Sequence, residues 1–543
     1  MELVDLLAWM KVSDIGTLSL ILLLSMFVLL ALGMPLGFAS AFLAAMTLIM
    51  KFGPDILFRD FGRGPFSVLA QAVYRQMTNY VLISVPLFIL MAALLERSGI
   101  ARDMYASLNQ WLSRTRGGIA IVTSIMAVIM AAMSGIIGGE VVLLGLIALP
   151  QMLRLGYNQN LAIGTICASG SLGTMIPPSI VLIFYGLVTE TSIKALFTAS
   201  FIPGFMLASF FIIYIIIRTN LNPSLAPLPP DNPDDPKGKE KSLMFLGFVS
   251  LLTAGAAAIL SLRALFFTLT GENAIREGVD PIPLGMVSDF PWLIGALVIA
   301  LGIVFLVAGR ERSMRGWEMG KGLVAPIVVV GVVLGSIYGG ITGITEAAGM
   351  GVIAVFVIGL IRREMTFEIV WDSVMRTLKS TGTIIWVTIG AAALAAAYTL
   401  VGGPTYVANL ITSAELPTMG IILVMMLIFL IMGMFMDWVG IVLLIMPVFL
   451  PIVLKLPPAE LGVLGTLDPK HVAIWFGVVF CMNMQVSFLS PPFGPAAFYL
   501  KSVAPDHISL TDIFRGFLPF IMIQLVALSV LLIWPPIISL LLD

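Results

Sequence analysis

The chain has 543 residues, of which 59% are hydrophobic and only 11% are charged, whereas an ordinary soluble domain has roughly 25% charged residues. This composition excludes a soluble protein of this length, which would need a polar surface, and it excludes a disordered chain. The 29 basic and 30 acidic residues leave no basic surface for nucleic acid, and two cysteines with two histidines supply neither a disulfide framework nor a zinc cluster. The sequence therefore predicts an all-α polytopic membrane protein.

Long apolar runs are spread along the whole chain, and a helix needs ~20 apolar residues to cross a bilayer. Runs long enough for one or two crossings lie at 17–50, 81–95, 118–150, 160–187, 199–217, 243–269, 290–309, 323–360, 381–401, 418–454, 472–500 and 517–541. Glycine and proline interrupt several of them, as at Gly33-Met34-Pro35. Glu2 and Asp5 make the N-terminus acidic, and no small-residue cleavage site follows the first run, so we expect residue 1 to belong to the mature protein.

Charge in the short connections predicts the orientation of the chain, because cytoplasmic loops carry an excess of Lys and Arg. Basic residues concentrate in four connections, at 96–116, 237–241, 310–321 and directly after residue 360. We expect all four to be cytoplasmic. The connection at 271–289 is acidic and is expected outside, so the runs at 243–269 and 290–309 should form a hairpin that leaves the cytoplasm and returns to it.

One segment, 219–241, is rich in Pro, Asp and Lys and has no apolar period, which is typical of a linker. It divides the chain into two similar halves. We therefore predict a first membrane repeat at 1–218, a linker with an extra transmembrane hairpin at 219–320, and a second membrane repeat at 321–543.

The two halves share uncommon residues in the same order. Residues 167–185 match 481–499 at a constant offset, and residues 140–150 match 437–447. The matched residues are Cys167 with Cys481, Pro177-Pro178 with Pro491-Pro492, Phe184-Tyr185 with Phe498-Tyr499, Glu140 with Asp437, and Pro150 with Pro447. Chance similarity between apolar sequences would align Leu and Val, not these rarer residues, so we favour an internal repeat. The two copies are inverted in the membrane if each half has an odd number of crossings.

The paired prolines favour transport over other membrane functions. Pro177 and Pro178, and likewise Pro491 and Pro492, interrupt a helix because proline lacks a backbone donor and clashes with the preceding turn. Broken backbone survives in a membrane only inside protein or along a wet cavity. Breaks at corresponding places in two repeats predict a binding site at the repeat interface, where free carbonyls can hold Na⁺ and helix N-termini can face an anion.

Two glycine-rich segments, SGIIGGE at 134–140 and GMFMD at 433–437, are each typical of the tip of a re-entrant helical hairpin. Ser134 offers a hydroxyl and a carbonyl to an ion. The alternative for such glycines is close helix packing. For Glu140 and Asp437 an ion site and a water-facing or helix-capping role both stay open.

A third acid, Glu346, lies in SIYGGITGITEAAG, where Thr345-Glu346 before an alanine run indicates a helix start. We favour a capping role for Glu346 over direct ligation.

Several of these stretches resemble the large membrane subunit of tripartite ATP-independent periplasmic (TRAP) transporters. The matching stretches are NYVLISVPLFILMA at 79–92, MSGIIGGE at 133–140, GTMIPPSIVLIFYGLVTETSIKALFTASFIPG at 173–204, GGITGITEAAG at 339–349, GMFMDWVGIVLLIMPVFLPI at 433–452 and LSPPFGP at 489–495. The resemblance covers about residues 17–217 and 321–541.

This resemblance implies an elevator-type secondary transporter in the bacterial inner membrane that imports a small organic anion with Na⁺. It also implies a periplasmic binding protein and a small four-helix membrane subunit, expected as a separate chain because no four-helix module precedes residue 17. Carried over by position, one Na⁺ site would use Ser134, Gly173, Ile176 and Pro177, and the other Gly433, Ser487, Ser490 and Phe493. Two features depart from the family pattern. Alanine stands at position 131, where the family often has serine, and an extra hairpin lies within 219–320.

Two other functional classes are alternatives to this assignment. A self-sufficient Na⁺/carboxylate symporter would share the two-hairpin architecture without a binding protein. A membrane enzyme is disfavoured because the sequence has no His-rich motif, metal cluster or nucleophile–base pair. No cofactor is expected beyond Na⁺ as the coupling ion, and C4-dicarboxylates or related carboxylates are the substrates that the resemblance implies.

Overall fold

The computed structural model of the chain describes residues 11–57, 64–112, 114–230, 236–270, 285–413, 416–492 and 494–542. Every regular element within these ranges is helical. Ten helices of the described part are long and apolar enough to cross a membrane. The prediction of an all-α polytopic membrane protein is confirmed.

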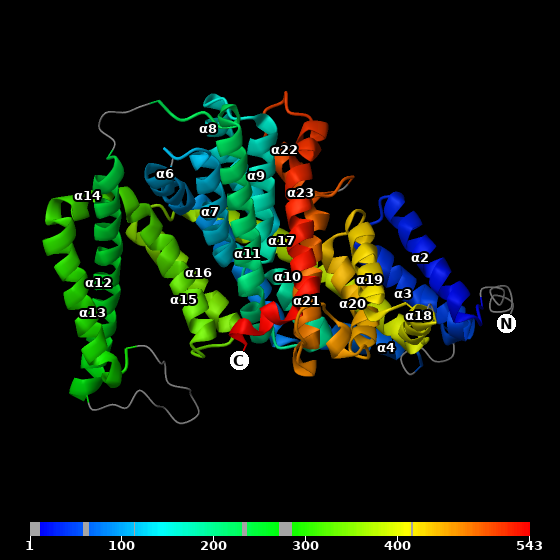
Figure 1. Cartoon of the computed structure of the whole chain (residues 1–543). Helices are drawn as coiled ribbons and strands as arrows, with labels where there is room; N and C mark the ends of the chain where they lie inside the picture. The colour runs from blue at the N-terminus through cyan, green and yellow to red at the C-terminus, as the bar shows by residue number, and fades with distance from the viewer. Residues whose placement is uncertain are drawn as a thin grey trace.

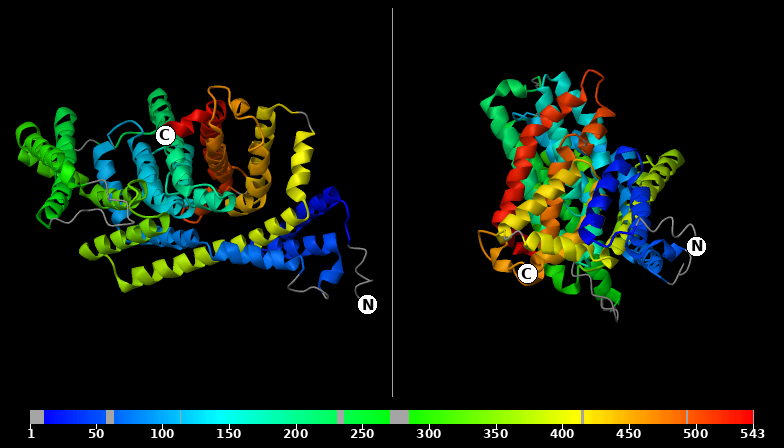
Figure 2. Two further views of the ribbon diagram at one scale, coloured as in Figure 1. Left: turned by 90° about the horizontal axis from the view of Figure 1, so that it is seen from below. Right: turned by 90° about the vertical axis from the view of Figure 1, so that its right-hand side faces the viewer.

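The N-terminal helices and one very long helix form a layer of their own. The break at Gly33 separates α2 (Ile15–Ala31) from α3 (Leu36–Phe52). Helix α17 (Phe367–Leu400) has 34 residues, which is about 51 Å at 1.5 Å per residue. It packs along α3, α4 (Phe66–Met77) and α5 (Ser84–Arg97). Figure 2 shows this blue and yellow-green layer beside the rest of the bundle. We call α3, α5 and α17 the long-helix layer.

Two helical hairpins lie beside this layer (Figure 1). The first is α7 (Gly118–Ser134) with α8 (Ile137–Arg154), and the second is α19 (Thr418–Gly433) with α20 (Trp438–Val453). Their tips are the glycine-rich segments at 134–140 and 433–437. Gly135 has a φ of +67° and ends α7, a conformation that strongly favours glycine.

Each hairpin is followed by an interrupted helix and then by a long one. In the first half the order is α9 (Gln159–Ser171), α10 (Ile180–Thr189) and α11 (Ile193–Leu221). In the second half it is α21 (Val472–Leu489), α22 (Pro495–Lys501) and α23 (Leu510–Ile533). The interruptions contain Pro177-Pro178 and Pro491-Pro492, and both Pro-Pro bonds are cis.

Contacts across the two halves give the relative direction of the interrupted helices. Cys167 Sγ faces Ala496 O at 3.7 Å, Cys481 Sγ faces Thr174 O at 2.9 Å, and Tyr185 Oη donates to Ala473 O at 2.6 Å. The residue numbers rise on one partner while they fall on the other, so the two interrupted helices run antiparallel. Two inverted copies would have this arrangement, and the repeat itself, with the boundaries given above, stays a prediction.

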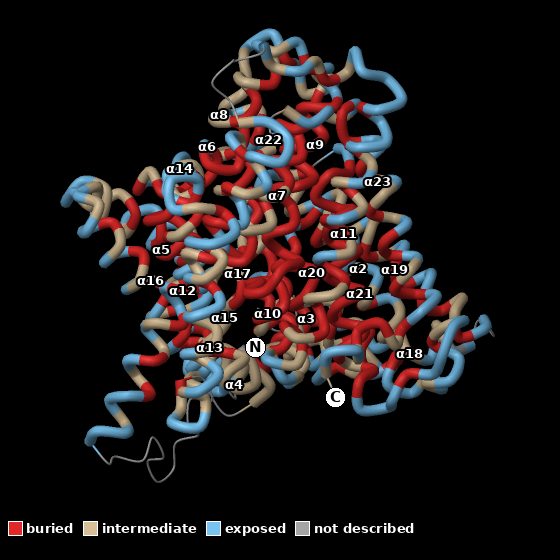
Figure 3. Tube along the Cα trace, turned by 60° about the vertical axis from the view of Figure 1, so that its left-hand side comes forward, coloured by how far each residue is buried: buried red, intermediate tan, exposed pale blue. Residues whose placement is uncertain are grey.

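The interrupted helices are the most deeply buried part of the molecule. Every residue from Leu161 to Gly186 and from Phe476 to Ser490 is buried, apolar and polar alike. Figure 3 shows buried residues in red through the middle of the molecule, whereas α13 (Phe290–Gly302) has only Ala300 buried. The backbone freed by the first break is therefore enclosed by protein and not by lipid.

Two connections that were expected to be loops contain helices. Segment 96–116 includes α6 (Ile100–Leu112), whose apolar face is buried at Ile100, Met104 and Leu108. Segment 310–321 includes α14 (Arg310–Gly320), where Glu311 and Arg315 pair one turn apart at 3.0 Å. Charged residues on one face do not prevent a helix when the opposite face packs. The prediction of loops here was wrong, although α6 and α14 do pack against each other at one end of the molecule.

The extra segment forms a peripheral group of helices. Helix α12 (Gly238–Thr270) packs mainly against α13 and α14. The aromatic contacts of Trp111 on α6 with Phe245 and Phe248 join it to the body. The expected outside connection lies mostly outside the described residues, since the structure describes only its last part, 285–289.

Candidate functional site

The tip of the first hairpin closes onto the first helix break. Gly135 O accepts a hydrogen bond from Ile180 N at 3.3 Å. A Cβ on Gly135 would lie 2.4 Å from Pro178 O, too close for any side chain. Pro177 and Ile176 are buried in this break. The predicted residues of the first ion site therefore lie at one hairpin–break junction.

Glu140 lies at the centre of this junction. Its Oε1 accepts a hydrogen bond from Ser134 Oγ across the hairpin tip. A Cβ on Gly173 would lie 2.5 Å from the same oxygen and 2.9 Å from the other carboxyl oxygen. Only glycine at 173 leaves room for the Glu140 carboxyl. The hydroxyl group of Ser134, the carboxyl group of Glu140 and the backbone of Gly173 therefore lie together.

Within the described residues, the carboxyl group of Glu140 has no positively charged partner. The side chain is 0% exposed, its Oε2 has no hydrogen-bond partner among the described residues, and no ion pair joins it to a described basic residue. The N-terminus of α8 favours an acid by about 0.3–1 kcal/mol and at most ~2 kcal/mol. Burying an unpaired carboxylate costs several kcal/mol. The helix dipole does not offset this cost, so the carboxyl is either neutral or accompanied by a cation.

The second hairpin meets the second break in a similar way. A Cβ on Gly433 would lie 2.2 Å from Ser487 Oγ, which shows how closely α19 and α21 approach. Ser487 and Ser490 are buried, and Ser490 Oγ donates to Val486 O at 2.8 Å. Pro491 and Pro492 are exposed, and Phe493 lies outside the described residues. The structure brings Gly433 and Ser487 together and places Ser490 one turn further along.

The two acids that the repeat aligns take different places. Glu140 is fully buried in the first turn of α8, whereas Asp437 is the N-cap of α20 and is exposed. Glu346 lies in the first turn of α16 (Ile344–Ile361) and accepts a hydrogen bond from Tyr80 Oη at 3.0 Å. Glu346 lies away from both hairpin tips, in agreement with a role at the helix start.

A cavity of about 400 Å³ lies between the two hairpin tips and the long-helix layer. Its lining includes Gly138 and Gly139 of the first hairpin, Asp437 and Trp438 of the second, Glu96 of α5, Arg376, Ser380 and Thr383 of α17, and Tyr499 of α22. We call it the hairpin cavity. It is the one place where both tips and the long-helix layer meet among the cavities described.

One ion pair stands on the wall of the hairpin cavity. Arg376 Nη1 lies 2.8 Å from Glu96 Oε2. The Glu96 side chain is 11% exposed and that of Arg376 is 43% exposed, so the arginine is the more accessible partner. Arg376 therefore presents a positive charge to the cavity while Glu96 anchors it.

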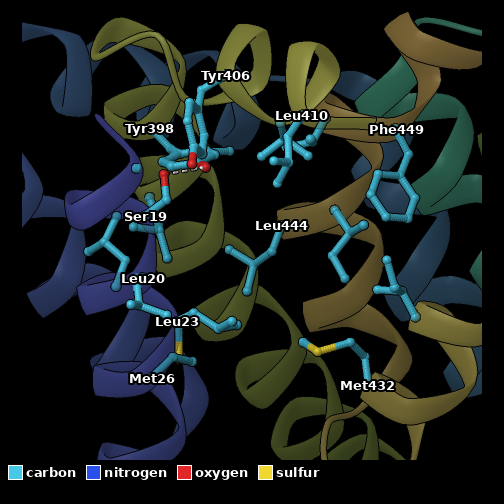
Figure 4. Close-up of a pocket in the computed structure, with 18 of the residues that line it drawn as sticks. Ser19, Leu20, Leu23, Met26, Tyr398, Tyr406, Leu410, Met432, Leu444 and Phe449 are labelled. Atoms are coloured by element: carbon cyan, nitrogen blue, oxygen red, sulfur yellow. Dashed lines mark hydrogen bonds between the residues drawn. The ribbon is translucent and has the colours of Figure 1, made fainter. Parts of the chain in front are cut away.

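A second cavity, of about 440 Å³, lies between α2, α17, α18 (Gly403–Thr412) and the second hairpin (Figure 4). Its lining is almost entirely aliphatic, with a hydrogen bond of 2.9 Å between Ser19 Oγ and Tyr398 Oη at one end. No charged residue lines it. With no charge in its lining, it suits a small anion less well than the hairpin cavity does.

Arg376, Glu96 and Tyr499 were not predicted as site residues, and Tyr499 was noted only as the match of Tyr185 in the repeat. Arg376 is a charged residue in the first third of a long helix, and Glu96 lies at the end of an apolar run. Both could therefore have been identified from the sequence as charged residues in or near the membrane. Their pairing joins positions 280 residues apart and could not be read from the sequence.

A helical bundle in which two hairpin tips face two interrupted helices beside a polar cavity defines a membrane transport protein. Residues 23–538 match the family described as tripartite ATP-independent periplasmic transporter, DctM component. The chain belongs to this family. It is a multi-pass transport permease of the bacterial inner membrane and not an enzyme, so the resemblance seen in the sequence is confirmed.

Curated relatives match most of the chain. The C4-dicarboxylate TRAP transporter large permease protein DctM of Pseudomonas aeruginosa is 26% identical, covering 85% of this chain and 86% of that protein. The ectoine/5-hydroxyectoine TRAP transporter large permease protein UehC of Ruegeria pomeroyi is 28% identical, covering 95% and 96%. A solved structure of the Alcanivorax borkumensis YdaH transporter aligns with a TM-score of 0.46 and 16% identity, covering 88% of this chain and 89% of that one.

Proposed function

We propose that this permease couples the inward movement of Na⁺ to the import of a small organic anion, as the large membrane subunit of a tripartite transporter. The observation that carries the proposal is the pair of hairpin–break junctions, one at Glu140 and one at Ser487, on either side of the hairpin cavity. Ions held at the junctions and an anion held in the cavity would share the same two hairpin tips, so each could stabilise the binding of the other.

The ions are proposed to bind at the junctions through oxygen ligands. The first site uses Ser134, Gly173, Ile176 and Pro177, and the second uses Gly433, Ser487, Ser490 and Phe493. Most ligands are backbone carbonyls that the interrupted helices leave free, which suits a hard cation such as Na⁺. The burial of the first junction and of Gly433, Ser487 and Ser490 at the second supports this, because a cation there would be shielded from bulk water.

The substrate is proposed to bind in the hairpin cavity through Arg376. A guanidinium group binds carboxylates with two parallel hydrogen bonds, and Ser380, Thr383 and Tyr499 add hydroxyl groups on the same lining. A C4-dicarboxylate or a related carboxylate fits this chemistry, and one relative is named for C4-dicarboxylate transport. Because another relative is named for ectoine transport, the exact substrate depends on features outside the shared fold.

The transport motion is proposed to be of the elevator type. The hairpins and interrupted helices form one packed unit across the two halves, held together by contacts such as Gln485 Nε2 with Thr174 Oγ1 at 2.6 Å. The long-helix layer lies beside this unit, and the hairpin cavity lies between them. Sliding of the unit along α17 would move the two hairpin tips, which form one wall of the hairpin cavity, relative to Arg376 and would open the cavity to one side of the membrane and then to the other.

A periplasmic binding protein is proposed to deliver the substrate, and a separate small four-helix membrane subunit to complete the assembly. To test the function, the complex is reconstituted in liposomes with loaded binding protein and an inward Na⁺ gradient. Uptake should require Na⁺ and should fall to background when K⁺ replaces it. Unchanged uptake in K⁺ would contradict Na⁺ coupling, and full uptake without the binding protein would favour a self-sufficient symporter.

The peripheral helices should be dispensable for transport. Because α12 and α13 touch the rest mainly through α14 and α6, replacing residues 240–312 by a short polar linker should leave Na⁺-dependent uptake measurable. The measurement is uptake normalised to the amount of protein in the membrane. Loss of uptake at normal membrane abundance would show that this segment takes part in transport or holds the small subunit.

A further inference from the structure

We infer that Glu140 supplies a charged ligand to the first cation site, so that the two proposed sites are chemically unequal. This inference rests on the proposed function, because it assigns a further ligand to an ion site within it. The first site would hold its cation with a carboxylate, and the second would hold its cation with neutral oxygens only.

The position of the carboxyl group carries the inference. Glu140 lies between residues that already belong to the first site: Ser134 donates to its Oε1, and Gly173 faces both of its oxygens. Within the described ranges Oε2 has no hydrogen-bond donor, although it is fully buried. A buried acceptor of this kind is filled by a proton, a water molecule or a cation.

A role as a simple helix cap does not explain this geometry. Glu140 is in the first turn of α8, but no side chain caps that helix by a hydrogen bond. Its single hydrogen bond among the described residues comes from a side chain on the opposite arm of the hairpin. The carboxyl thus points across the hairpin tip toward the break, where the ion is proposed to bind, and not along its own helix end.

The neighbouring charges also favour a cation. The neighbouring acid is Glu96. Its carboxyl group lies against Gly139, the residue before Glu140, and it forms an ion pair with Arg376. Arg376 is therefore engaged and does not neutralise Glu140. Among the described residues of the second junction no acid takes the corresponding place, because Asp437 lies on the lining of the hairpin cavity. A cation beside Glu140 would supply the missing positive charge at the first junction.

The inference predicts that the first site fills at lower Na⁺ than the second and that this difference depends on the charge of residue 140. Glu140→Gln keeps the shape and can still accept the hydrogen bond of Ser134, but it removes the charge. In equilibrium binding of ²²Na⁺ to the purified complex, Glu140→Gln should weaken the tighter site by at least about tenfold and leave the weaker site unchanged. The increase of Tm on adding Na⁺ should shrink in parallel.

Glu346→Gln is the matched control, because it neutralises an exposed acid in the first turn of another membrane helix. It should bind ²²Na⁺ like the wild type. If Glu140→Gln does not fold, Glu140→Asp keeps the charge on a shorter side chain and should weaken the tighter site by roughly threefold to tenfold. Wild-type binding in the folded variant would overturn the inference and leave Glu140 as a neutral structural carboxyl. Absence of any Na⁺ binding in the wild type would instead contradict the proposed function.

Discussion

Replacing Gly433 by alanine should abolish Na⁺-driven uptake, while the same change at Gly331 should leave uptake within about twofold of the wild type. A Cβ on Gly433 would lie 2.2 Å from Ser487 Oγ and 2.4 Å from Ser487 Cβ, so the hairpin tip must move away from the interrupted helix. Overpacking of this kind costs about 1–3 kcal/mol. The displaced oxygens would no longer surround a cation, so the loss of uptake should exceed any loss of stability.

Gly331 is the control because it lies in a membrane helix, α15 (Val324–Tyr338), with nothing within 4 Å of its added Cβ. Gly173→Ala should behave like Gly433→Ala, because its Cβ would meet the Glu140 carboxyl. The measurements are uptake into liposomes and Tm with and without Na⁺. If Gly433→Ala takes up substrate as well as Gly331→Ala does, the second junction is not an ion site.

Arg376→Gln should lower uptake by about a hundredfold or more. The change removes the positive charge that faces the hairpin cavity. It also leaves the carboxylate of Glu96, which is nearly buried, without its ion-pair partner. Because the arginine side chain is 43% exposed, we expect a stability loss of about 1–2 kcal/mol, smaller than for a fully buried pair. The double variant Glu96→Gln/Arg376→Gln should recover Tm but not uptake.

Arg97→Gln is the matched control, since Arg97 forms a comparable ion pair with Asp372 at 2.7 Å and neither residue lines the hairpin cavity. It should leave uptake close to that of the wild type. Normal uptake by Arg376→Gln would exclude Arg376 as the substrate-binding group. Recovery of uptake in the double variant would show that Arg376 acts only by neutralising Glu96.

The sequence predicted the interruptions of the membrane helices well, because proline and glycine act locally. Gly33 and the two Pro-Pro pairs each coincide with a helix break in the structure. Ser134 and Glu140 were both predicted at the tip of the first hairpin, and the structure places them there. Features set by nearby residues were therefore accessible from the chain alone.

Features that depend on tertiary packing were not accessible. Arg376 and Glu96 come from helices far apart in the chain, and nothing local indicates that they pair on one cavity wall. Segments 96–116 and 310–321 were predicted to be cytoplasmic loops from their Lys and Arg residues, whereas α6 and α14 form there with buried faces that depend on their packing partners. The repeat aligned Glu140 with Asp437, but only the surrounding helices decide that one is enclosed and the other lies open to the cavity.

The most direct test of Na⁺ coupling is a measurement of Na⁺ movement driven by the substrate. Liposomes that contain the complex hold equal Na⁺ on both sides, with tracer ²²Na⁺ and loaded binding protein outside. If ion and anion binding are linked through the shared hairpin tips, an inward substrate gradient must drive net ²²Na⁺ accumulation. The account predicts accumulation that is lost in Gly433→Ala and in the absence of substrate. Substrate uptake without any net entry of ²²Na⁺ would contradict it.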